Sequence, residues 1–111
     1  MKYYVVLVTT PNRKTSEKLS KGILQNKLAA CVNTLPGVRS RYRWKGKIET
    51  AREELLLIKT VQKRLPRLIQ WVRKNHPYTV CETVALPIAA GNKAYLQWIT
   101  KVLSSGKAGL I

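Results

Sequence analysis

A predicted β-hairpin that turns at Lys45-Gly46-Lys47 constrains the fold of this chain more than any other feature of the sequence. Before the turn, residues 41–44 alternate large side chains as a strand does, and after it comes the apolar run of residues 55–58. A strand, a glycine-containing turn and a second strand are typical of a hairpin. Aromatic and cationic side chains gather at the tip, which is unusual for a plain connection between strands.

Length and composition fit one domain with its own core, so we expect a single domain over residues 1–111. No apolar run is long enough to cross a bilayer, and the N-terminus lacks the pattern of a signal peptide. The two cysteines lack the spacing of a disulfide framework, which favours a reducing, cytoplasmic setting. Residues 104–111 contain two glycines and are expected to form a flexible tail.

The hydrophobic periodicity predicts the order strand, helix, strand, strand, helix, strand, helix. A bend at Pro36-Gly37 interrupts the second strand, and Pro87 places the fourth strand at an edge or bulge, because proline cannot donate to the ladder. The first six elements form the βαββαβ pattern, of which the ferredoxin-like packing is one form. The expected strands cover residues 3–9, 28–44, 53–61 and 83–89.

The helices between these strands carry recognisable start signals and apolar faces. Thr10-Pro11 resembles an N-cap followed by proline at the first helical position, and that helix is expected to run to about Lys27. Gly91-Asn92 precedes the last helix, which is apolar on two sides and so needs two surfaces to bury against. We expect its own sheet to be one surface and a neighbouring subunit to be the other. The middle helix presents the apolar positions Leu65, Leu68, Ile69 and Val72.

Four short strings follow one another with a characteristic order and spacing over most of the chain: Lys27–Asn33, Ile58–Thr60, Asn75–Tyr78 and Ala85–Ile88. Together they resemble the CutA divalent-cation-tolerance family. The resemblance implies a ferredoxin-like α/β (α+β) sandwich with an extra C-terminal helix and a long bent hairpin, assembled as a homotrimer. It also implies a role in metal tolerance through binding of divalent ions, copper foremost.

The candidate metal ligands are Cys31, His76 and Glu82. None of them forms a CxxC or HxxxH pair, so a site would have to be assembled across the fold or between subunits. Thiolate and imidazole donors favour copper over magnesium or calcium. The alternatives stay open: Cys31 also fits a small buried strand residue, and His76 also fits a helix end, where its cation would complement the dipole.

A second candidate site is an inter-subunit cleft around a small ligand, formed by Trp44, Lys45, Lys59 and Tyr78. We expect no enzyme, because the chain has one histidine, no aspartate and none of the nucleophile, phosphate-loop or dinucleotide fingerprints. A Lys-Glu or His-Glu set alone is too common to indicate catalysis.

The net charge of +16, from 21 basic and 5 acidic residues, suggests a polyanion as partner. Arg39, Arg41 and Arg43 alternate along a strand and so share one face, about 7 Å apart. They form either an anion-binding strip, for nonspecific polyanion or nucleic-acid contact, or a solvated face that discourages edge pairing. Tyr42 and Trp44 take the opposite face, which argues against base stacking.

The high positive charge also suggests an alternative function. Three +16 chains together carry +48, so only a large apolar contact between them would outweigh the repulsion. Relatives in the family are usually rich in acids around the hairpin, where this chain has arginines. The alternative is therefore a positively supercharged scaffold, natural or engineered, that binds polyanions and has little native metal function.

Overall fold

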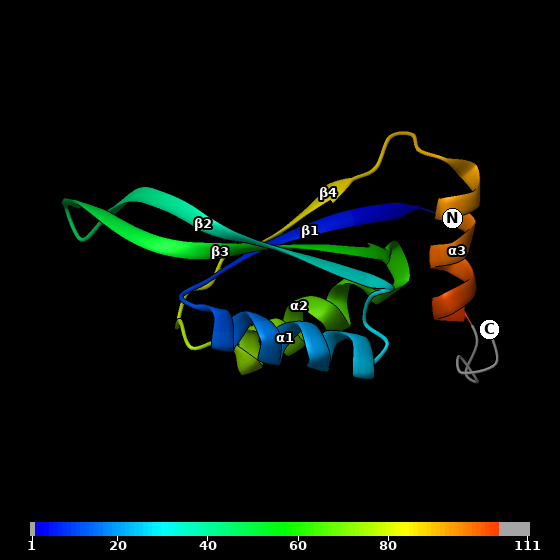
Figure 1. Ribbon diagram of the computed structural model, residues 1–111, viewed down its shortest axis with the longest axis horizontal. Coiled ribbons are helices and arrows are strands. Elements are labelled where there is room, and N and C mark those ends of the chain that lie inside the picture. Colours follow the sequence, from blue (N-terminus) through cyan, green and yellow to red (C-terminus); the bar gives the residue numbers. More distant parts are fainter. Residues whose placement is uncertain (1, 105–111) are drawn as a thin grey trace.

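The computed structural model describes residues 2–104 and forms a four-stranded antiparallel sheet with helices on one face and at one end (Figure 1). The strand order is β2-β3-β1-β4, so β1 and β3 are central and β2 and β4 are edges. This order confirms the ferredoxin-like prediction. The elements are β1 (Tyr3–Thr10), α1 (Arg13–Gln25), β2 (Cys31–Trp44), β3 (Lys47–Val61), η1 (Gln62–Arg64), α2 (Leu65–Asn75), β4 (Thr83–Pro87) and α3 (Lys93–Ser104).

Because side chains alternate between the two faces of a strand, one set of side chains from the sheet packs against α1 and α2. On β1 and β3 these are residues such as Val6, which faces Ile58 across the pair, and both are fully buried. Apolar side chains of both helices complete this core, as the helical periodicity predicted for Leu68 and Val72 of α2. The main buried residues are Val6, Val8, Leu19, Ile23, Leu28, Leu56, Ile58, Leu68 and Val72.

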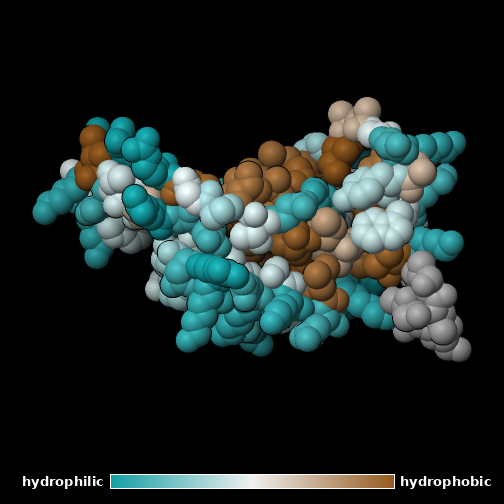
Figure 2. Space-filling view, in the orientation of Figure 1, coloured by the Kyte–Doolittle hydropathy of each residue, from teal (hydrophilic) through white to brown (hydrophobic). Residues whose placement is uncertain are grey.

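The opposite face of the sheet is apolar but lacks a helix over its middle, and we call it the open face. It carries Val5, Leu7 and Leu57, which alternate with the core residues and are only half-buried. On the edge strands, Leu35 and Leu86 belong to the same face and are 41% and 44% exposed. Figure 2 shows apolar side chains gathered over the middle of the sheet, between the hairpin and α3.

Helix α3 packs at one end of the open face, where Ile99 and Leu103 bury with Val61 in a small second core. A side-chain hydrogen bond of 2.5 Å joins Tyr3 to Thr100. The outer side of α3 carries Tyr95 and Trp98, each 40% exposed. The prediction that this helix is apolar on two sides is therefore confirmed, and one of those sides lies uncovered in a single chain.

Strands β2 and β3 extend beyond the helices as a long hairpin arm (Figure 1). The turn at its tip has two residues, Lys45 with φ of 51° and Gly46 with φ of 79°, the left-handed pair of a type I′ hairpin. At the base of the arm, β2 holds one residue more than β3 between the Leu35–Leu55 and Val38–Glu53 pairs. This is the bulge predicted at Pro36-Gly37, and Gly37 has the positive φ of 75° that favours glycine there.

Several predicted boundaries were wrong. The return strand begins at Lys47, because a two-residue turn lets pairing start at once, and not at residue 53. Helix α1 begins after Asn12, whose side chain accepts from the Thr15 N–H, and not after Thr10, which ends β1. The helix ends at Gln25, two residues before the predicted Lys27.

The remaining differences lie in α2, β4 and the C-terminus. Ile69 was predicted on the buried face of α2 but is 39% exposed. Strand β4 ends at Pro87, at the sheet edge that proline indicated. Ser104, expected to open the tail, is the last residue of α3, and residues 105–111 lie outside the described residues.

Candidate functional site

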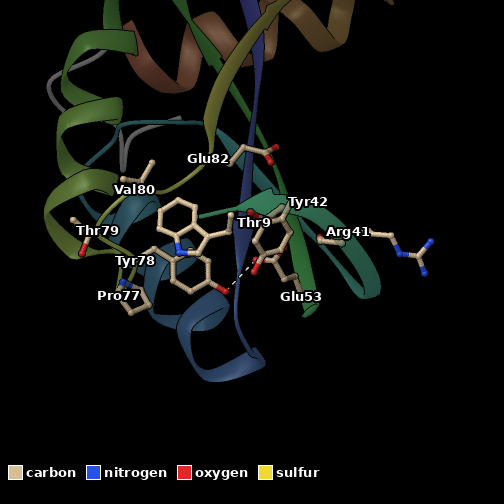
Figure 3. Close-up of a pocket in the computed structure, with 11 residues that line it drawn as sticks. Thr9, Arg41, Tyr42, Glu53, Pro77, Tyr78, Thr79, Val80 and Glu82 are labelled. Carbon is tan, nitrogen blue, oxygen red and sulfur yellow. Dashed lines mark hydrogen bonds between the residues drawn. The ribbon is translucent and has the colours of Figure 1, made fainter. Parts of the chain in front are cut away.

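An open cavity of about 750 Å³ lies at the base of the hairpin arm, where the arm meets the loop that joins α2 to β4 (Figure 3). Its walls come from three parts of the chain that are distant in sequence: the end of β1, the paired strands of the arm, and residues 77–82. The lining residues are Thr9, Ser40, Arg41, Tyr42, Trp44, Glu53, Pro77, Tyr78, Thr79, Val80 and Glu82.

The bulge decides which side chains of β2 face this cavity. Before it, Leu35 belongs to the open face; after it, the even-numbered Ser40, Tyr42 and Trp44 belong to that face instead. They lie opposite odd-numbered residues of β3 on the same face, among them Glu53. The aromatic side of the arm is therefore a continuation of the open face of the sheet.

Glu53, at 8%, is the least exposed glutamate among the described residues. The Tyr78 hydroxyl donates to its Oε2 at 3.0 Å. Burial raises the pKa of Tyr78 to about 12, and the hydrogen bond and charge of Glu53 act in the same direction. Tyr78 therefore keeps its proton at neutral pH and remains a donor to the carboxylate.

His76 fixes the position of the loop that joins α2 to β4. Its Nδ1 accepts from the Tyr78 N–H at 3.0 Å, which leaves the proton on Nε2, and Nε2 donates to the Thr9 carbonyl at 2.7 Å. The ring is 7% exposed. Both nitrogens are thus used inside the chain, and the imidazole acts as a clamp between the end of β1 and the loop that carries Tyr78.

The three candidate metal ligands do not come together within one chain. Cys31 pairs with Lys59, which lies beside Val5, four residues from the Thr9 that His76 contacts. Four strand residues span about 13 Å. Among the described residues, no three His, Cys, Asp or Glu side chains lie close enough to hold a metal ion together. Glu82 lines the cavity and is exposed.

The four residues predicted to form the inter-subunit cleft also do not all come together within one chain. Trp44 and Tyr78 line the cavity, whereas Lys45 sits at the tip of the arm in the left-handed turn. Lys59 lies on the open face near Cys31 and donates to Asn33. One chain therefore brings together half of this set, and the inter-subunit cleft stays a prediction.

The arginines take the face of the arm away from the cavity. Arg39, Arg41 and Arg43 are exposed, and Arg39 lies directly opposite Arg52. Arg41 also counts among the lining residues, but its side chain leads away from the cavity (Figure 3).

Sequence reasoning missed Glu53 and Tyr42 as site residues. The signal was available: counting outward from the Lys45–Gly46 turn pairs Trp44 with Lys47 and Tyr42 with Glu49, and two further steps reach Glu53 on the same face. The role of His76 as a clamp had no such signal, because its partners come from a strand 67 residues away and from its own loop.

Comparison with known proteins gives a consistent result. The sequence model described as "CutA1 divalent ion tolerance protein" matches residues 4–102. "Protein CutA, chloroplastic" of Arabidopsis thaliana is 52% identical over 95 residues, covering 86% of this chain and 52% of that protein. The chain thus spans about half the length of several curated relatives that it matches.

Two further matches cover most of this chain and nearly the whole of the matched protein. "Divalent-cation tolerance protein CutA" of Thermus thermophilus is 47% identical over 95 residues, which is 86% of this chain and 92% of that protein. The crystal structure of CutA1 from Oryza sativa superimposes with a TM-score of 0.88 at 47% identity, covering 90% of this chain and 92% of that one.

The raised pKa of Tyr78 gives a testable pH dependence. In an ultraviolet titration, the difference between the unmodified chain and Tyr78→Phe should show one tyrosine ionising near pH 12 instead of 10. Glu53→Gln should lower this pKa only part of the way, because burial is the larger cause. Glu54→Gln, a matched change on the other face of β3, should leave it unchanged.

The raised pKa of Tyr78 also predicts how the stability of the fold changes with pH. The folded state holds the Tyr78 proton more tightly than the unfolded state, so this contribution is complete below pH 10 and is lost as the pH rises to about 12. The free energy of unfolding should fall more steeply over that interval in the unmodified chain than in Tyr78→Phe. Equal slopes would contradict the assignment.

Proposed function

Because the chain belongs to the CutA1 divalent ion tolerance family, we propose that it binds divalent metal ions, copper foremost, as a homotrimer that contributes to metal tolerance. The observation that carries the assembly is the open face of the sheet. A folded chain leaves Leu35, Leu86 and the outer side of α3 exposed, and burying them between copies is the natural source of association free energy.

The metal proposal depends on ligands from more than one copy. Cys31 is the most suitable soft donor, since it is half-buried on the open face and its thiol makes a weak contact of 3.7 Å with Asn33. His76 would have to give up its bond to Thr9 or Tyr78 in order to bind a metal ion. Glu82 is free to supply an oxygen ligand from the rim of the cavity.

The expectations about compartment and catalysis remain proposals. Both cysteines are free, which suits a reducing compartment and supports the cytoplasmic assignment. The Arabidopsis relative is named chloroplastic, so family membership alone does not select a compartment. No helix in residues 2–104 is long and apolar enough to span a membrane. The tolerance function in the family description involves no stated reaction, in keeping with a protein that is not an enzyme.

The trimer can be tested with two matched leucines. Leu86 on the open face is 44% exposed and Leu24 on α1 is 43% exposed, so a change to Gln should disturb the single chain equally little. Burial of one leucine contributes about 1.5–3 kcal/mol. In 0.15 M salt, light scattering should give the mass of three chains for the unmodified protein and for Leu24→Gln, and a concentration-dependent loss of trimer for Leu86→Gln. A stable folded monomer of the unmodified chain would overturn the proposal.

Copper binding can be tested with the two cysteines as a matched pair. Titration with Cu²⁺, and in parallel with redox-inert Zn²⁺, should give weaker binding by about tenfold or more for Cys31→Ser, because a thiolate ligand is lost. Cys81→Ser, which alters the other half-buried thiol, should bind as the unmodified chain does. His76→Ala and Glu82→Gln should each weaken binding too. A variant that binds normally removes its residue from the ligand set, and normal binding by Cys31→Ser contradicts the site.

A second candidate function is nonspecific binding of polyanions by the arginine face of the arm. The observation in its favour is that Arg39 lies directly opposite Arg52, with Arg41 and Arg43 on the same exposed face. Like charges directly opposite across a strand pair are destabilising unless an anion is bound between them. A phosphate backbone supplies such anions at regular intervals.

This function predicts a specific salt dependence. Changing Arg39, Arg41 and Arg43 to Gln should reduce the slope of log affinity against log salt, for random-sequence duplex DNA, by up to about 2.7. Changing the exposed Lys14, Lys18 and Lys21 of α1 to Gln alters the net charge equally and should reduce the slope less. Equal reductions would mean attraction by net charge alone, without a binding strip.

A further inference from the structure

The side of α1 and α2 that faces away from the sheet carries half of the net charge of the chain, and we call it the helical face. Helix α1 and the segment of residues 62–75, which holds η1 and α2, contain nine basic residues and one acidic residue, a net charge of +8 out of +16. That acidic residue, Glu17, is paired with Arg13 in the one ion pair among residues 2–104. Figure 2 shows hydrophilic side chains gathered on this side of the molecule.

Helical spacing directs these cations away from the core. Ser16, Leu19 and Ile23 are the buried residues of α1, and Leu68 and Val72 are those of α2. Positions about half a turn from the buried residues lie on the outside of each helix. The exposed cations at those outer positions and in η1 are Lys14, Lys18, Lys21, Lys63, Arg67 and Lys74.

The two helices lie side by side, so their cations form one broad surface. The Trp71 ring of α2 packs against Gly22 of α1, where a Cβ atom would collide with two ring carbons. Helices in direct contact have axes about 8–10 Å apart. The seven-residue interval from Lys14 to Lys21 spans about 10 Å along α1. The helical face is therefore about as wide as it is long, and it forms a patch instead of a ridge.

This arrangement works against the stability of the helices. Lys14 lies in the first turn of α1, where the helix dipole disfavours a cation, and neither helix has an acidic residue in its first turn. Lys18 follows Lys14 by four residues and Lys21 follows Lys18 by three, and like charges at these spacings repel each other. Folding therefore does not explain the pattern, whereas an anionic partner would compensate for it.

The residue types favour a membrane surface as that partner. Five of the six exposed cations are lysines, which act as point charges on flexible stems and suit a diffuse negative surface. The arm instead carries arginines, whose planar forks suit individual phosphates.

Two apolar side chains flank the lysines. Leu24 is 43% exposed and Ile69 is 39% exposed. Each lies two residues from the Gly22–Trp71 contact and therefore on the outer side of the helix pair. Exposed apolar side chains beside lysines are typical of helices that lie in the membrane interface.

We propose that the helical face docks on the surface of a bilayer rich in anionic lipid, with its lysines among the headgroups and with Leu24 and Ile69 at the edge of the acyl region. The helices cover the side of the sheet opposite the open face (Figure 1). An assembly that buries the open face therefore leaves the helical face uncovered. The proposal depends neither on copper binding nor on the arginines of the arm.

Sedimentation with lipid vesicles tests the docking at about 0.15 M salt. The chain should bind vesicles of phosphatidylcholine that contain about 30% phosphatidylserine, and pure phosphatidylcholine vesicles about a hundredfold more weakly. Each lysine near an anionic surface contributes about fivefold in affinity, so changing Lys14, Lys18 and Lys21 together to Gln should lower it about a hundredfold. Changing the same three residues to Arg should retain binding.

The arm supplies the matched control. Changing its three arginines at positions 39, 41 and 43 to Gln removes the same charge and should lower vesicle affinity far less. The Gln variant of the three lysines should melt at the same temperature as the unmodified chain or at a higher one, because it removes repulsion within α1. This keeps the loss of binding independent of folding.

A fluorescent label reports which face meets the bilayer. With Cys31 and Cys81 replaced by Ser, Gln70→Cys on the outer side of α2 and Thr50→Cys beside the arm arginines provide two exposed attachment points. An environment-sensitive dye should shift to shorter wavelength on vesicle binding at position 70 and should not shift at position 50.

Equal losses for the lysine and arginine changes would overturn the proposal, because net charge alone would then attract the chain. Equal binding to both kinds of vesicle, or a dye response at position 50 and not at position 70, would overturn it as well. If the lysine change weakened binding to duplex DNA more than binding to vesicles, the helical face would be a nucleic-acid surface and the proposal would be wrong.

Discussion

One extra residue at the base of the hairpin arm controls how the site is assembled. The bulge between Leu35 and Val38 reverses the alternation of β2 and transfers Tyr42 and Trp44 to the side of the sheet that carries Glu53. In a regular strand pair the arginines would occupy that side, and the cavity would be lined by cations. Gly37 adopts the left-handed conformation that this irregularity needs, at little cost in backbone strain.

The two faces of the arm carry different side chains. Arg39, Arg41 and Arg43 stand on one side of the two-stranded arm, and Tyr42, Trp44 and Glu53 stand on the other, together with Lys47. The backbone therefore separates these arginines from the aromatic rings and from the hydrogen bond between Tyr78 and Glu53.

Much of the fold could be predicted from the sequence because each signal is local. The Lys45–Gly46 turn, the bend at Pro36-Gly37 and the edge position of Pro87 all follow from the backbone chemistry of one or two residues. The helix start at Asn12 was missed because three capping residues, Thr10, Asn12 and Thr15, compete within six positions.

The site was harder to predict, since it depends on contacts between distant segments. Trp44, Tyr78 and Glu82 were identified and meet at the cavity, but Cys31 and Lys59 lie elsewhere on the sheet. Residue type suggested that His76 was a ligand or a helix-end cation, whereas its hydrogen bonds to Thr9 and Tyr78 make it a structural clamp. Such partners are specified by tertiary packing and leave no trace in spacing.

The Pro36-Gly37 interruption also affects how chains meet edge to edge. Strand β2 has 14 residues and forms one border of the sheet, a length that would otherwise offer a continuous template to another strand. Proline removes one donor from that border and the bulge breaks its regular spacing, so a foreign strand can follow it for only half its length. Fibril growth along this border is thereby discouraged.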